Sequence, residues 1–116
     1  MGDMIYKILR LQEWRTARNQ GELTGVSVDT ADGYIHFSTA VQVRETAARH
    51  FSGEPELILL AVDPDGLGDA LRREPSRGGD LFPHLYAALP LNKVAGVYRL
   101  VRGEDGKHQF PAETGV

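Results

Sequence analysis

The stretch LILLAV, residues 57–62, decides the fold. It is continuously apolar and lies between the dipeptides Glu-Pro (54–55) and Asp-Pro (63–64), which favour a change of chain direction. A short apolar run between such breaks is typical of a central strand that is buried on both faces. We therefore predict a sheet built around residues 57–62.

The segments before this strand predict two strands and two helices. Residues 4–9 are apolar and β-prone apart from Lys7, and an Asp-Gly turn at 32–33 leads into a second strand at 34–38. Apolar residues at helical spacing predict a helix from Leu11 to a C-cap at Gly21. Thr39 and Gln42 match a capping box and predict a helix over 39–51, whereas residues 22–31 are expected to be irregular.

The segments after the central strand are rich in β-structure signals. Residues 63–66 predict a turn, 71–74 a short strand, 76–80 a loop, 94–101 a strand and 104–106 a hairpin turn into 107–110, with a frayed end at 111–116. Helices in the first half and strands in the second indicate an α+β fold with a mainly antiparallel or mixed sheet. We expect one domain over 1–116, with its core at about 4–110.

Composition narrows the function classes. The chain has 116 residues, a net charge of -3 and no cysteine, so nucleic acid is not the expected partner and thiolate or cysteine-metal chemistry is excluded. No apolar run approaches the roughly 20 residues of a membrane span, and the first residues show no secretory signal pattern. We expect a cytoplasmic protein with no membrane partner.

Residues 74–90, EPSRGGDLFPHLYAALP, concentrate groups capable of chemistry in a segment that glycine and proline predict to be a loop. Residues 32–39, DGYIHFST, are the expected partner of this loop across one cleft. Strand alternation places Tyr34, His36 and Ser38 on one face, a wall suited to a nucleotide-sized ligand. A structural histidine bonded to a carbonyl is the alternative for His36.

The loop itself supplies acid–base and anion-binding candidates. Glu74 can act as an acid, a base or an oxocarbenium stabiliser, or can be a solvated carboxylate paired with Arg72, Arg73 or Arg77. Arg77 with Gly78 and Gly79 can form a nest of backbone N–H groups for phosphate, or only a turn. Pro83 limits the backbone before His84, which can aim the histidine ring, and the turn can alternatively pack Phe82 and Tyr86 into the core.

Two further possibilities concern charged or metal-binding residues. Lys7 in an apolar strand must either extend to the sheet edge or meet an anion, such as a carboxylate or a bound phosphate. His36 and His84 with Glu74 or Asp80 could form a two-histidine, one-carboxylate metal site. His50 and His108 are expected at the surface.

Four segments resemble the bacterial family called "domain of unknown function 952": Ile5-Tyr6-Lys7-Ile8, Asp32 to Thr39, Leu59 to Asp63, and Phe82-Pro83-His84-Leu85-Tyr86. That family looks related to the ADP-ribosyltransferase fold, particularly to the catalytic domain of tRNA 2′-phosphotransferases. The resemblance implies a split antiparallel or mixed sheet with two main helices and a cleft for a nicotinamide dinucleotide.

By this resemblance Ser38 would lie on the nicotinamide side of the cleft, and Tyr6 and Lys7 would face the ribose. Lys7 replaces a histidine of the related strand, and His84 stands near the position of a catalytic glutamate. The leading hypothesis is an ADP-ribosyltransferase-like domain that binds NAD or an ADP-ribose-like small molecule, with Glu74, His84 and His36 as catalytic candidates. A tyrosine, Tyr34 or Tyr86, would stack on a ring of that ligand. The alternatives are a non-catalytic binding module and a metal-dependent enzyme.

Overall fold

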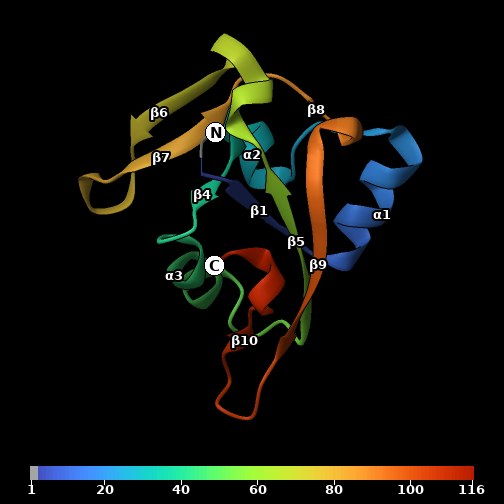
Figure 1. Ribbon diagram of the computed structural model, residues 1–116, viewed down its shortest axis with the longest axis vertical. Coiled ribbons are helices and arrows are strands. Elements are labelled where there is room, and N and C mark those ends of the chain that lie inside the picture. The colour runs from blue at the N-terminus through green and yellow to red at the C-terminus, as the bar shows by residue number, and fades with distance from the viewer. Residues whose placement is uncertain (1–2) are drawn as a thin grey trace.

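The computed structural model describes residues 3–116, apart from the side chains of Ser27, Val28 and Arg77. The fold is α+β, as predicted, and each strand pairing in this part of the chain is antiparallel. The largest sheet has, in spatial order, β10 (His108–Gln109), β9 (Val94–Arg102), β5 (Glu56–Val62), β1 (Ile5–Leu9) and β4 (Ser38–Thr39). Figure 1 shows the long strands β5 and β9 running side by side through the middle of the molecule.

Strand β5 is the centre of the large sheet, which confirms the role predicted for LILLAV. Its residues Leu57, Leu59, Leu60 and Val62 have no exposed surface. Because neighbouring side chains point to opposite faces, Leu60 and Val62 enter one core cluster while Leu57 and Leu59 enter another. The sheet is therefore covered on both faces, which explains why the strand is apolar throughout.

Two α-helices pack against this sheet. The helix α1 (Leu11–Gln20) ends at Gly21 with φ 79°, as predicted, and places Ala17 in the first core cluster. The helix α3 (Val43–His50) places Val43 and Ala47 in the second. Thr39 and Gln42 make the predicted reciprocal bonds, Thr39 N–H to Gln42 Oε1 at 3.0 Å and Gln42 N–H to Thr39 Oγ1 at 3.3 Å, although α3 begins only at Val43.

The segment predicted to be irregular contains a third helix, α2 (Ser27–Asp32). Its six residues are too few to show helical periodicity, which is why the prediction was wrong. Val26 N–H donates to the Asp29 carboxylate at 2.9 Å and satisfies one backbone group at the start of this helix. Gly33 ends the helix with φ 86°, a conformation that favours glycine.

The prediction of a loop over residues 74–90 was also wrong. Most of this segment belongs to a hairpin of β6 (Leu71–Pro75) and β7 (Leu81–Leu85). Strand β7 is the middle of a three-stranded sheet, β3 (Ile35–His36), β7 and β6, which projects from the upper left of Figure 1. Proline is disfavoured in a central strand because it has no N–H. Pro83 has no N–H to donate, but its carbonyl accepts from Phe37 N–H at 2.9 Å.

The predicted strand 34–38 divides between two sheets. Residues Ile35 and His36 pair with β7, whereas Ser38 and Thr39 pair with β1. A single residue, Phe37, lies between them and is buried in the first core cluster. The remaining pair, β2 (Glu22–Leu23) with β8 (Leu89–Pro90), links the loop after α1 to the segment after β7.

The C-terminal part of the chain differs from the prediction in two places, at His108 and over residues 111–116. His108 is buried, and its Nε2 lies 2.7 Å from the Glu54 carbonyl oxygen. The segment 111–116 contains a short 3-10 turn, Ala112–Thr114, and Tyr6 Oη donates to the Thr114 carbonyl at 2.6 Å. Burial of Thr114 against the sheet holds this end of the chain in place. His50 is exposed, as predicted.

Candidate functional site

One face of the three-stranded sheet carries most of the predicted site residues. His36 pairs with His84, and His84 pairs with Arg72, so the three side chains point to the same side of the sheet. Alternation adds the other members of this surface, which we name the histidine face: Tyr34, His36, Arg72, Glu74, His84 and Tyr86. The opposite side of the sheet carries Ile35 and Leu85, which are buried in the first core cluster.

The rings of the histidine face touch one another. Tyr34 stacks on His84 with 4.1 Å between ring centroids and 28° between planes, and lies 4.7 Å from His36 and 5.1 Å from Tyr86. The His36 and His84 rings are 5.5 Å apart. The two histidines that the sequence places far apart therefore converge, as the shared-cleft hypothesis required.

A buried carboxylate, Asp29, lies behind this face and holds His36. Asp29 Oδ1 accepts from the backbone N–H of His36 at 3.1 Å and lies 2.6 Å from His36 Nδ1. The same oxygen accepts from Lys7 Nζ at 3.0 Å. Asp29 and Lys7 are buried, with 2% and 5% of their surface exposed. Of the two predictions for Lys7, the structure therefore confirms an anionic partner and not extension to the sheet edge.

The charges of the buried pair are set by competition between burial and partners. Burial raises the pKa of Asp29, but hydrogen bonds from His36 and the charge of Lys7 outweigh it and lower the pKa to about 2. Burial lowers the pKa of Lys7, and the charge of Asp29 opposes that change. Both groups are hydrogen-bonded, as a buried ion pair requires.

The low pKa of Asp29 predicts an acid limit to stability. Because the folded-state pKa of about 2 lies below the ordinary 3.8, the stabilisation is present above about pH 4 and is lost as the pH falls through 2. A pKa difference of this size corresponds to roughly 2 kcal/mol. Urea unfolding of the native protein between pH 1.5 and 7 should show this loss. In Asp29→Asn, the free energy of unfolding should depend less on pH in the acid range. An unchanged acid limb in Asp29→Asn would contradict the prediction.

Glu74 joins the second histidine to a tyrosine. Its Oε1 lies 2.8 Å from His84 Nδ1 and accepts from Tyr86 Oη at 2.7 Å. The hydrogen bond from Tyr86, followed by that from His84, lowers the pKa of Glu74, while the same bond to Glu74 raises the pKa of Tyr86. Glu74 is thus an ionised carboxylate at the open edge of the face, with the guanidinium of Arg72 4.8 Å from the Tyr86 ring.

His36 is held from both sides. Its Nδ1 faces the buried Asp29, and its Nε2 lies 2.9 Å from Asp32 Oδ2. The His36 side chain is 29% exposed and that of Asp32 is 47% exposed. The imidazole ring therefore bridges a buried carboxylate, Asp29, and an exposed one, Asp32. The alternative prediction for His36 was a hydrogen bond to a carbonyl. The ring nitrogens instead face two carboxylates, Asp29 and Asp32.

Two predicted ligand-binding residues lie elsewhere. Tyr6 and Ser38 pair with each other in the large sheet, so their side chains share one side of it, and Lys7 points to the other. Tyr6 is buried in the second core cluster, and Ser38 Oγ lies 2.9 Å from Thr46 Oγ1 of α3. The division of the strand corrects the expectation that Ser38 shares a wall with His36. Tyr6 and Lys7 do not face one ligand, because neighbours in β1 point to opposite sides of the sheet.

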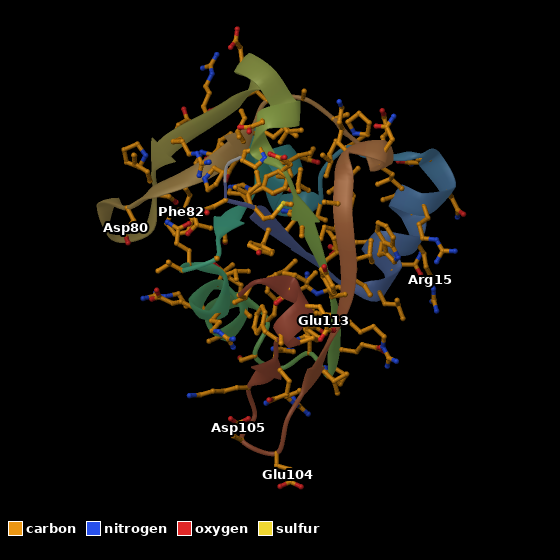
Figure 2. The ribbon with its side chains drawn as sticks, in the orientation of Figure 1. Arg15, Asp80, Phe82, Glu104, Asp105 and Glu113 are labelled. Atoms are coloured by element: carbon orange, nitrogen blue, oxygen red, sulfur yellow. The ribbon has the colours of Figure 1, made fainter. Side chains whose placement is uncertain are left out.

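The glycine nest also lies apart from the histidine face. Gly78 and Gly79 form the end of the β6–β7 hairpin beyond the last pair, Pro75 with Leu81, and Asp80 marks this tip in Figure 2. Both glycines have positive φ, and the Gly79 N–H donates to the Ser76 carbonyl at 2.7 Å. The predicted role of Arg77 concerns a side chain outside the described residues.

Sequence reasoning missed three members of the site: Asp29, Asp32 and Arg72. The sequence signal for Asp29 was Lys7, because a lysine in a buried strand demands an anion nearby. The signal for Asp32 was its place directly before the turn glycine and four residues before His36. Arg72 was considered only as an ion-pair partner of Glu74, and its position above Tyr86 depends on strand pairing.

Two surface cavities lie away from the histidine face. A surface cavity of about 400 Å³ lies among residues that include Ile5, Thr39 and Arg73, and one of about 460 Å³ lies between α3 and β10; the six residues of the histidine face line neither. Over residues 3–116, no three His, Cys, Asp or Glu side chains form a group that could hold a metal ion. Within these residues, His36 and His84 therefore have no third side chain placed to complete the predicted metal site. No helix in the described part of the chain is long and apolar enough to cross a membrane.

Comparisons with known proteins agree on the family. Residues 8–97 match the family described as "Protein of unknown function (DUF952)". The crystal structure of protein CC0527 from Caulobacter crescentus is 44% identical over 97% of this chain and 99% of that one, with a TM-score of 0.91. Its solution NMR structure is 47% identical over 91% of each chain, with a TM-score of 0.83. A search of curated proteins gives no match. On this evidence the chain belongs to the DUF952 family of proteins of unknown function.

Proposed function

We propose that the histidine face binds a nucleotide-like small molecule, such as ADP-ribose or NAD. The observation that carries the proposal is the convergence of His36 and His84, each held by a carboxylate, against the Tyr34 ring. Tyr86 is 39% exposed, so part of its surface is available for a planar ring to stack on. The Arg72 guanidinium lies over one face of that ring, 4.8 Å from its centroid, and is the positive group for a phosphate.

A carboxylate, a histidine and a tyrosine on the same face support a proposal of ADP-ribosyl transfer. In such a reaction the bond between the ribose C1′ and the nicotinamide nitrogen breaks, and nicotinamide leaves with the electron pair. The oxygen of water or of another acceptor bonds to C1′ and loses its proton. We assign Glu74 to stabilise the positive charge near C1′ and to accept this proton, while His84 and Tyr86 orient its carboxylate.

A non-catalytic binding module is the second candidate, and Lys7 favours it. By the resemblance described above, Lys7 replaces a ribose-binding histidine. Its ammonium is buried and bonded to Asp29, so it is not directed at a ligand on the histidine face. Such a module would bind the ligand without releasing nicotinamide, and this outcome separates the two candidates.

Calorimetric titration tests binding itself. We expect heat with NAD and ADP-ribose, and Tyr86→Ala should weaken both affinities by about 10- to 100-fold, because stacking of one base is worth about 1–3 kcal/mol. Tyr86→Phe keeps the ring and should retain most of the affinity. Arg15→Ala, on the exposed surface of α1 far from the β6–β7 hairpin in Figure 2, is the matched control. No heat with either ligand at millimolar concentration would overturn the proposal.

A further inference from the structure

His36 has one ring nitrogen that is fixed by the core and one that is open to exchange. The Nδ1 partner, Asp29, is buried and also bonded to Lys7 Nζ and the Val26 and His36 N–H groups, so it cannot leave without exposing several unpaired groups. The Nε2 partner, Asp32, is an exposed carboxylate on the last residue of α2. Only this second bond can be given up at low cost.

Both hydrogen bonds require His36 to donate twice. An ionised carboxylate accepts hydrogen bonds and cannot donate them. Asp29 and Asp32 can therefore both be bonded only to a ring with a proton on each nitrogen, which is the cationic form of histidine. The other charged or titratable groups at this ring are Lys7 behind Asp29, with Tyr34 and His84 beside it.

We propose that His36 Nε2 is an anion-binding donor and that Asp32 occupies it as a built-in substitute for the ligand's anionic group. A phosphate or carboxylate oxygen can replace the Asp32 oxygen with the same geometry, because each is an acceptor of a charge-assisted bond. The pairing of an exposed carboxylate with a cationic ring contributes little in water, so a ligand that adds a second contact can displace it.

This inference rests on the proposed function for its location but specifies a different contact. Asp32 lowers the affinity for any anion at this position, and its displacement is a cost that each ligand must meet. Asp32 and Asp29 are three residues apart on α2, so one short helix supplies both the fixed partner and the exchangeable one. His36 is therefore a positioning and anion-binding group in the ligand-free protein, and not a free base.

Titration with inorganic phosphate tests the inference by NMR of 15N-labelled histidine. The native protein should show the His36 ring with protons on both nitrogens, and phosphate should shift the Nε2 signal. Asp32→Ala should bind phosphate about three- to fivefold more tightly, a change that corresponds to about 0.7–1 kcal/mol. His36→Gln in the Asp32→Ala background should remove the gain.

The control is Glu104→Ala, which removes the same charge from the exposed turn at the far end of the molecule in Figure 2. It should leave phosphate affinity unchanged, which separates a local effect from net charge. Asp32→Asn, of nearly the same shape, repeats the test if Asp32→Ala alters the fold. Equal phosphate affinity in native protein and both Asp32 variants, or a His36 ring with one proton, would overturn the inference. Phosphate binding without nucleotide binding would overturn the proposed function alone.

Discussion

Replacing Asp29 by alanine is expected to lower the free energy of unfolding by about 3–5 kcal/mol, the usual cost of removing one partner from a buried ion pair. The variant leaves the Lys7 ammonium in the core without an anion and leaves two backbone N–H groups, of Val26 and His36, without their acceptor. Urea unfolding at pH 7, followed by circular dichroism, measures the change.

A double-variant cycle separates the lysine charge from the other contacts of Asp29. Asn keeps one side-chain oxygen, which can accept from only one of the two N–H groups because these bond to different oxygens of Asp29, and Met fills the volume of Lys7 without its charge. Lys7→Met with Asp29→Asn should therefore be more stable than Asp29→Asn alone. Arg49→Ala breaks an exposed pair with Glu45 on α3 and should cost less than about 0.5 kcal/mol. A loss below about 1 kcal/mol in Asp29→Ala would contradict the structural role assigned to the pair.

The second large effect concerns turnover. If the protein releases nicotinamide from NAD, Glu74→Gln should lower the rate by about 10²- to 10⁴-fold, because the amide can neither accept the proton nor stabilise positive charge. Nicotinamide release is measured by chromatography of the reaction mixture. The hydrogen bonds from Tyr86 and His84 keep the pKa of Glu74 below its ordinary 4.5, so activity should persist at neutral pH and fall only under acid conditions.

Glu56 offers a matched control for this variant. Its side chain is 31% exposed and bonded to Arg99, and that of Glu74 is 33% exposed, so the two glutamates differ mainly in location. Glu56→Gln should leave the rate unchanged. Native protein that binds NAD and releases no nicotinamide would favour the binding module, and equal rates in both variants would remove Glu74 from the reaction.

Local pattern predicted many features of the fold and part of the site. The apolar run at 57–62 identified the central strand, and alternation correctly placed Tyr34 and His36 on the same side of one strand. The capping residues Thr39 and Gln42 bond to each other as predicted, and Gly21 ends α1. These features depend on the conformation of a few neighbouring residues, which sequence reports directly.

Local patterns did not predict which distant strands pair with one another. Glycine and proline marked residues 74–90 as a loop, yet β7 lies between β3 and β6, and Pro83 joins the sheet as an acceptor through its carbonyl. Alternation continued through residue 38 would keep Ser38 with His36, but the chain changes sheets at Phe37. No local pattern encodes such a change, since it depends on which strand each residue meets.

The sequence by itself determined a strand buried on both faces, two main helices, and a lysine that needed an anion or a path to the sheet edge. Only the tertiary structure decided that the anion is Asp29, that His36 meets His84, and that Tyr6 and Ser38 lie on the far side of the large sheet. The physical reason is that periodicity fixes the direction of a side chain relative to its own strand or helix. Which groups then meet across the core is settled by the joint packing of all elements.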